Sequence, residues 1–218
     1  MKKKLYISNL AWDHKDFLKV KELIKKYQFD GLDIAPLKIK NDWKNLNELS
    51  RKNSKVFSEQ KIKINAIQGI FFKKKFNLFK KNKNHIEDIF NHTLNILKIC
   101  KIYKCKKVII GSSEFRKRNG INLKIADQIF VDFFVRFKKI LIKKKIFLCL
   151  EAIPRQYNED FIFDFFHLIK LVKKINSKWI KINLDSSLFH FEKFDEKLLF
   201  KNIKNIKNIQ VTEKNFKY

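Results

Sequence analysis

The chain has 218 residues, of which 45% are hydrophobic and 14% aromatic, so it suits a single domain over residues 1–218 with a large core. Its formal net charge is +28, but only five of its 50 cationic residues are arginine, and the lysines are spread along the chain. A nucleic-acid-binding surface needs a cluster or stripe of cations, so this even spread argues against nucleic acid as a partner.

Short apolar runs alternate with longer amphipathic runs along the chain, and the short runs are the predicted strands. They cover residues 5–10, 31–35, 62–69, 107–111, 146–152, 179–185 and 206–212. Helices are predicted between them, at residues 15–27, 43–57, 85–103, 123–142, 160–175 and 196–202. Gly69, Gly111, Pro36 and Pro154 fall at or just after strand ends, where the chain needs a tight turn or a stop.

This alternation predicts a parallel sheet, and seven repeats without a domain break favour a (β/α)8-type TIM barrel. An open doubly wound sheet is the alternative, but the chain has no glycine-rich phosphate loop of the kind that fold uses. A full barrel has eight strands, and the sequence shows seven. We therefore expect a C-terminally incomplete chain, a seven-stranded variant, or a gap closed by a partner, with a homo-oligomer left open.

The cysteines and the N-terminus indicate the compartment. Cys100, Cys105 and Cys149 have no metal-type spacing, and an odd, sparse count is typical of a reducing environment. No apolar stretch at the N-terminus is long enough for a signal peptide, and no run approaches the roughly 18 apolar residues of a membrane span. We expect a cytoplasmic protein without a membrane partner. Abundant Lys, Asn, Ile and Phe are typical of an AT-rich genome.

Two acidic residues end otherwise apolar predicted strands. Glu151 follows Ile-Phe-Leu-Cys-Leu, and Asp185 follows Ile-Lys-Ile-Asn-Leu. A buried carboxylate is costly unless it is paired or binds a cation, and strand ends form the active face of a barrel. We expect the two carboxylates to lie close together and either share a proton or hold a cation. The alternative is that they only cap neighbouring helices.

Other polar residues at or after strand ends are candidate substrate-binding residues. These are Asn9, Asp33, Gln68, Ser112 and Arg116. Arginine is suited to a bidentate grip on phosphate or carboxylate, so Arg116 is predicted to hold an anionic group, with an ordinary basic surface loop as the alternative. Of the five histidines, only His190 follows a strand closely enough to reach such a site.

Short motifs in a common order cover nearly the whole chain. They are Ile7–Trp12, Gly31–Pro36, Gln68-Gly69, Gly111-Ser112 with Arg116, Glu151–Pro154 with Tyr157 and Phe161, Leu184–Ser186, and Val211–Asn215. In order and spacing the chain resembles the sugar phosphate isomerase/epimerase family of the xylose-isomerase-like TIM barrel superfamily, which also includes AP endonucleases. The resemblance is specific for the superfamily and not for a substrate.

The resemblance implies a divalent metal, Mn, Mg or Zn, at the barrel top. Its usual ligands are a glutamate on strand five, an aspartate on strand six, a histidine on strand seven and a glutamate on strand eight. Glu151 and Asp185 match the first two. Gln210 stands at the third position, where its carbonyl oxygen suits only a hard cation, and the fourth position is missing. Of the two glutamates that serve as acid and base in such epimerases, only Glu151 is present.

Three functions follow from these observations. The first is an isomerase or epimerase of a small sugar or sugar phosphate, with Glu151 as the catalytic base, a metal polarising the oxygens and Arg116 holding an anionic group. The second is a non-catalytic or decayed barrel that binds a ligand or a partner, which Gln210 and the missing strand favour. The third, ranked lowest, is an AP-endonuclease-like DNA-repair enzyme, because that chemistry needs a histidine-rich zinc site.

Overall fold

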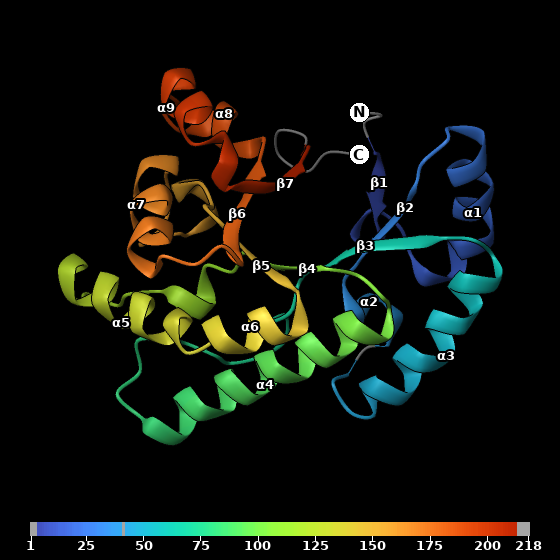
Figure 1. Ribbon diagram of the computed structural model, residues 1–218, viewed down its shortest axis with the longest axis horizontal. Helices are drawn as coiled ribbons and strands as arrows, with labels where there is room; N and C mark the ends of the chain where they lie inside the picture. The colour runs from blue at the N-terminus through green and yellow to red at the C-terminus, as the bar shows by residue number, and fades with distance from the viewer. Residues whose placement is uncertain (1–3, 41, 213–218) are drawn as a thin grey trace.

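The computed structural model describes residues 4–40 and 42–212, in which seven parallel strands form one sheet in the order β1 to β7. The strands are β1 Tyr6–Ser8, β2 Gly31–Ile34, β3 Lys63–Ile67, β4 Lys107–Ile110, β5 Phe147–Glu151, β6 Ile180–Asp185 and β7 Ile206–Gln210. The sheet curls into a partly closed barrel with its helices outside (Figure 1). The predicted parallel barrel is thereby confirmed, and an eighth strand is not found among the described residues.

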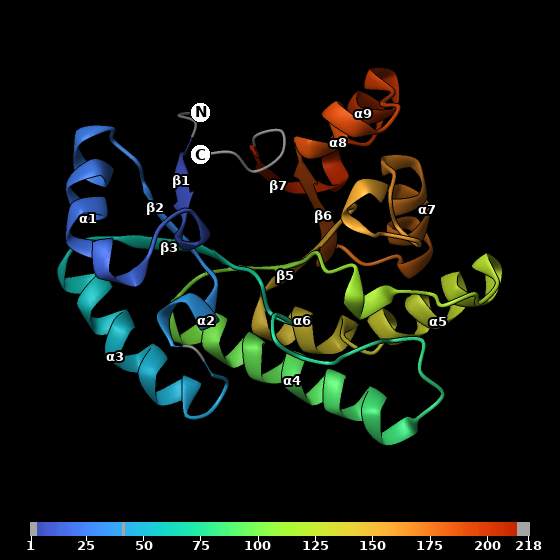
Figure 2. The same cartoon turned by 180° about the vertical axis from the view of Figure 1, so that it is seen from behind.

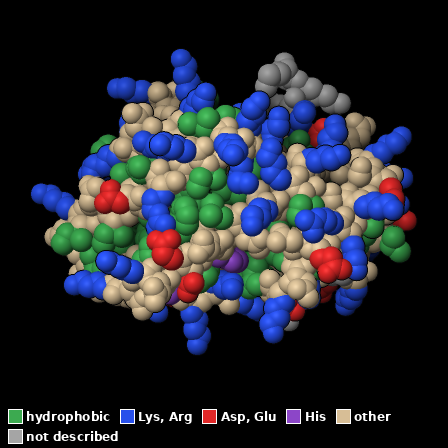
Figure 3. Space-filling view, turned by 60° about the horizontal axis from the view of Figure 1, so that its bottom comes forward, with side chains coloured by type: hydrophobic (Ala, Val, Ile, Leu, Met, Phe, Trp, Pro, Cys, Tyr) green, Lys and Arg blue, Asp and Glu red, His purple; other side chains and the backbone are tan. Residues whose placement is uncertain are grey.

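Helices connect successive strands and cover the outer face of the sheet (Figure 2). They are α1 Phe17–Lys26, α2 Pro36–Ile39, α3 Leu46–Glu59, α4 Lys83–Ile102, α5 Leu123–Val135, α6 Lys138–Lys144, α7 Phe165–Ile175, α8 Ser187–Phe191 and α9 Glu196–Lys201. None of the helices in the described ranges is long and apolar enough to cross a membrane. On the face seen in Figure 3, lysine and arginine side chains are scattered and form no continuous stripe.

Alternation along the strands divides the apolar residues into two layers. One set packs against the helices in the main core, including Leu32, Ile34, Leu148 and Ile182. The other set points into the barrel and is small. Ala66, Ile109 and Cys149 form it, with Phe147 packed against them. Cys149 is a small core residue, since its side chain is fully buried in this inner cluster.

Two predicted elements are shorter or broken because side chains redirect the backbone. The first strand was expected over residues 5–10 but ends at Ser8, whose hydroxyl oxygen accepts a hydrogen bond from the Leu10 amide at 3.0 Å and starts a short 3₁₀ turn. The helix expected over residues 123–142 is two helices, α5 and α6. At Phe137 the backbone hydrogen bond shortens to Phe134, three residues back, and the Phe137 ring packs in the core.

The helix expected from Asp160 begins only at Phe165. Asp164 is its N-cap and accepts a hydrogen bond from the His167 amide at 2.7 Å. The segment before it is held in a loop, because the Asp160 carboxylate accepts a hydrogen bond from the Arg118 amide at 2.8 Å. The short helices α2 and α8 were not predicted, since each is too short for a helical pattern to show in the sequence.

Candidate active site

Three polar residues end neighbouring strands at one edge of the sheet. Glu151 is the last residue of β5, Asp185 of β6 and Gln210 of β7. The strand register pairs Glu151 with Asn183 and Asp185 with Gln210. The carboxyl ends of parallel strands meet at the same edge of a sheet, so these side chains converge as the sequence predicted.

A chain of hydrogen-bonded side chains crosses the barrel mouth from this edge. Asn183 donates from its Nδ2 to Glu151 Oε2 and to Gln210 Oε1, each at 2.7 Å. Gln210 in turn donates from Nε2 to Gln68 Oε1 at 2.7 Å, and Gln68 donates to the Ser8 hydroxyl. Side chains from β5, β6, β7 and β1 and from the end of β3 therefore form one polar network, which we call the amide chain.

The Glu151 carboxyl has the properties of an acid–base group. It lies against Gly111, where a β-carbon would come within 2.8–3.0 Å of the carboxyl atoms, so the glycine leaves the room that this side chain occupies. Burial and the nearby Asp185 raise the pKa of Glu151 to about 7, against opposing effects of the Asn183 hydrogen bond and Arg116. A carboxyl with a pKa near neutrality can take up and release a proton at physiological pH.

Asp185 is held inside the protein by two hydrogen bonds. Its Oδ1 accepts from the Ser187 amide at 2.7 Å, and its Oδ2 accepts from the Thr212 hydroxyl at 2.7 Å. Its side chain is buried. The alternative interpretation, that a strand-end acid only caps a neighbouring helix, describes part of its role, since Ser187 is the first residue of α8.

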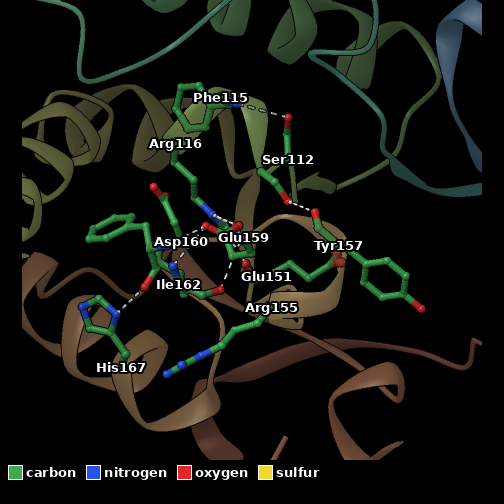
Figure 4. Close-up of polar contacts among 12 residues, drawn as sticks. Ser112, Phe115, Arg116, Glu151, Arg155, Tyr157, Glu159, Asp160, Ile162 and His167 are labelled. Atoms are coloured by element: carbon green, nitrogen blue, oxygen red, sulfur yellow. Dashed lines mark hydrogen bonds and ion pairs between the residues drawn. The ribbon is translucent and has the colours of Figure 1, made fainter. Parts of the chain in front are cut away.

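The Arg116 guanidinium points toward Glu159 and the backbone of Glu151 and Ile162 (Figure 4). Its side chain is 1% exposed and pairs with the Glu159 carboxylate at 2.7 Å. Its Nη1 donates to the Glu151 carbonyl at 2.7 Å and its Nη2 to the Ile162 carbonyl at 3.3 Å. These internal partners occupy the guanidinium. Sequence reasoning missed Glu159, because nothing in its local pattern separates it from the surface acids.

The remaining predicted residues lie in different surroundings. Asn9 bonds both polar groups of the Ala35 backbone, accepting from the amide at 2.6 Å and donating to the carbonyl at 3.1 Å. Ser112 accepts a long hydrogen bond of 3.4 Å from the Phe115 amide. His190 is exposed on α8, with its ring 6.1 Å from that of Phe191. The structure therefore does not bring these three into the amide chain.

Asp33 is a buried residue of β2. Asn65 donates to its carboxylate at 2.6 Å. Burial raises the pKa of Asp33, while hydrogen bonds from Asn65 and Gln210 and the charge of Lys107 oppose that rise. Lys107 donates to Asn208 at 2.6 Å. Asn65, Lys107 and Asn208 thus form a second polar layer around Asp33. The sequence analysis did not identify these three residues, although asparagine inside an apolar strand was an available signal.

The donor set of the described residues does not fit the metal site that the resemblance implies. Within the described ranges, no group of three or more His, Cys, Asp or Glu side chains could hold a metal ion. The amide of Gln210 is engaged at both ends, since its oxygen accepts from Asn183 and its nitrogen bonds Gln68 and Asp33. Both oxygens of Asp185 also accept protein hydrogen bonds. The predicted Glu213–Asn215 part of the last motif lies outside the described residues.

Comparison with known proteins places this geometry in a family. The model of the xylose isomerase-like TIM barrel family matches residues 22–216 of the chain. A search of curated protein sequences finds no match. The solved structures described next are only 14–18% identical to this chain in sequence, so their similarity to it shows the fold alone.

Three solved structures illustrate that similarity. D-psicose 3-epimerase with D-tagatose, from Clostridium cellulolyticum H10, has a TM-score of 0.78 at 14% identity, covering 97% of this chain and 73% of that one. AP endonuclease, family 2, from Brucella melitensis has a TM-score of 0.73 at 14% identity, covering 97% and 80%. The IolI protein with a binding zinc atom has a TM-score of 0.73 at 18% identity, covering 97% and 74%.

Proposed function

The chain belongs to the xylose isomerase-like TIM barrel family, and on this premise we propose that it acts as an isomerase or epimerase on a small sugar or sugar phosphate. The family expected from the sequence is confirmed, and the fold family includes sugar epimerases and isomerases. The observation that carries the proposal is Glu151, a strand-end carboxyl with a pKa of about 7. A base of that pKa suits proton abstraction next to a sugar carbonyl.

The surroundings of Glu151 support a polar ligand. The amide chain lies beside Glu151, and a carboxamide oxygen can accept a second hydrogen bond, from a sugar hydroxyl, beside its internal one. The net charge of +28 attracts anionic substrates, which favours a sugar phosphate. Arg116 supports the site indirectly, since it fixes the backbone carbonyl of Glu151. Ser112, half-buried just after β4, stays a candidate substrate-binding residue, whereas the Asn9 side chain is buried and bonds the Ala35 backbone.

The test is a proton-exchange assay. Purified protein is incubated in D₂O with a panel of small ketoses, aldoses and their phosphates, and NMR follows deuterium incorporation next to the carbonyl. Incorporation with at least one sugar, together with its epimer or isomer, is the expected result. Absence of exchange with the whole panel would overturn the enzyme assignment.

A non-catalytic barrel that binds a ligand is the second candidate. It is favoured by the extent to which Gln210 and Asp185 are hydrogen-bonded within the protein. In that case a sugar from the panel raises the melting temperature without any deuterium exchange. The two measurements together therefore separate the catalyst from the binder.

The poor fit to a metal yields a further prediction. Millimolar Mn²⁺, Mg²⁺ or Zn²⁺ is expected to leave the melting temperature unchanged, because the described residues bring only two acids, Glu151 and Asp185, to this edge, and both already accept protein hydrogen bonds. Gln210→His is the matched gain-of-function variant, since it places an imidazole beside two carboxylates. Zinc should raise the melting temperature of that variant. An increase in the unmodified protein that Asp185→Asn removes would show that the native site binds metal.

A further inference from the structure

Four helices end in the same backbone motif, which brings two side chains together just before the next strand. At α1, α3, α4 and α6 an amide donates to the carbonyl five residues earlier: Phe29 to Ile24, Ile62 to Phe57, Cys105 to Cys100 and Ile146 to Leu141. The residue before each donor has a positive φ, at Gln28, Lys61, Lys104 and Lys145. This is the Schellman arrangement, in which the two paired residues make an apolar contact.

At α4 the paired residues are both cysteines. In the other three helices the pair is aliphatic or aromatic, so the motif serves only for packing there. Cys100 and Cys105 are buried free thiols whose sulfur atoms lie 2.8 Å apart. The backbone hydrogen bond between them, 3.0 Å long, holds the two main chains at the spacing of the motif. Local capping geometry alone therefore keeps two oxidisable groups in contact.

We propose that Cys100 and Cys105 form a disulfide when a two-electron oxidant such as hydrogen peroxide is supplied. The proposed bond would staple the end of α4 to the segment that enters β4. This inference does not depend on the proposed sugar chemistry. Lys107 begins β4, so the two cysteines lie near the amino-terminal edge of the sheet, and the candidate active site lies at the carboxyl-terminal edge.

The reaction balances with peroxide as the only co-reactant. The thiolate of Cys105, the more exposed of the two residues, attacks one peroxide oxygen. An S–O bond forms, the O–O bond breaks, and hydroxide leaves as water after it takes a proton. The Cys100 sulfur then attacks the sulfenic sulfur, so that an S–S bond forms, the S–O bond breaks and a second water leaves with the Cys100 proton. Two electrons pass from the sulfurs to peroxide.

Burial sets the rate of this reaction. Peroxide reacts with the thiolate and not with the thiol, and both cysteines are buried, so little reactive sulfur meets the oxidant at neutral pH. Oxidation should therefore be slow at pH 7 and faster at pH 9. Once the sulfenic acid has formed, the second step is intramolecular and fast, because the partner sulfur is already in contact.

Oxidation of the full chain provides the test. Protein is equilibrated at pH 7 and pH 9 with peroxide, and separately with oxidised glutathione, until its mass is constant. It is then unfolded, alkylated and mapped by mass spectrometry. We expect a loss of about two mass units, a Cys100–Cys105 link with Cys149 still reduced, and a melting temperature raised by about 5 °C that dithiothreitol reverses.

Cysteine variants give the controls. Cys149→Ser should form the same disulfide, since that thiol lies in the separate inner cluster. Cys105→Ser should show neither the mass loss nor the rise in melting temperature. Three alkylated cysteines at equilibrium, or a bond that involves Cys149 or a second chain, would overturn the proposal. A disulfide that leaves the melting temperature unchanged or lower would overturn the stapling role.

Discussion

Replacing Arg116 with methionine is expected to lower the free energy of unfolding by about 3–5 kcal/mol. The guanidinium is 1% exposed and lies 2.7 Å from a Glu159 carboxylate that is fully buried. Methionine removes the charge but leaves that carboxylate without its cation. The carbonyl of Glu151 also loses its donor at 2.7 Å. Chemical denaturation monitored by circular dichroism measures the change.

Two further variants serve as controls for this prediction. Arg136→Met removes a pair of similar geometry, 2.8 Å long, but both partners are partly exposed, so its cost should stay within about 1 kcal/mol. The double variant Arg116→Met/Glu159→Gln removes both buried charges but keeps an oxygen that can accept from the Phe161 and Ile162 amides, so it should recover part of the lost stability. If Arg116→Met lowered the free energy of unfolding no more than Arg136→Met does, the buried contacts of Arg116 with Glu159 and Glu151 would not stabilise the fold as we infer.

Replacing Glu151 with glutamine is expected to reduce the rate of sugar isomerisation or epimerisation by about 10²–10⁴-fold. The amide keeps the size of the carboxyl group and its contact with Asn183 but cannot accept a proton. In the unmodified protein, kcat/KM should rise with pH through about 7, because the base must be ionised. Glu22→Gln, on the exposed face of α1, is the control and should leave the rate unchanged.

The pH dependence of the free energy of unfolding shows whether Glu151→Gln loses activity because of its chemistry or because of its folding. The folded-state pKa of Glu151, about 7, lies above its ordinary value of 4.5, so the folded protein binds this proton more tightly. The resulting stability is fully present below pH 4.5 and is lost as the pH rises through 7. As the pH rises from 4.5 through 7, the free energy of unfolding of the unmodified protein should therefore fall by at most about 3 kcal/mol relative to that of Glu151→Gln. A parallel pH dependence of the two proteins would contradict the pKa assignment.

Much of the candidate site was visible in the sequence. Glu151 and Asp185 stand out because each is an acid at the end of an apolar run, and a parallel barrel brings such ends to one edge. Gln68 was identified in the same way and Gln210 through the family resemblance, and the structure joins them at 2.7 Å. Their contact with each other was not predicted, since it depends on how tightly the sheet curls.

Arg116 shows where sequence reasoning ends. An arginine in a loop after a strand has the same local pattern whether it binds a substrate or a buried carboxylate. Its partner Glu159 lies in a loop after another strand, and only the packing of the two loops buries both charges. The break at Phe137 has a similar origin, because the position of its ring in the core ends a helix that the apolar pattern would continue.

The sequence by itself determined the seven strands, most of the helices between them and the strand-end location of the site, because these depend on local periodicity and on the geometry of parallel strands. The tertiary structure decided which polar side chains are hydrogen-bonded within the protein and which can contact a ligand. The amide of Gln210 bonds a residue 142 positions away, and the resulting hydrogen bonds leave it poorly suited to the ligand role predicted for it. Hydrogen-bond partners across a barrel depend on curvature and register, which no local pattern encodes.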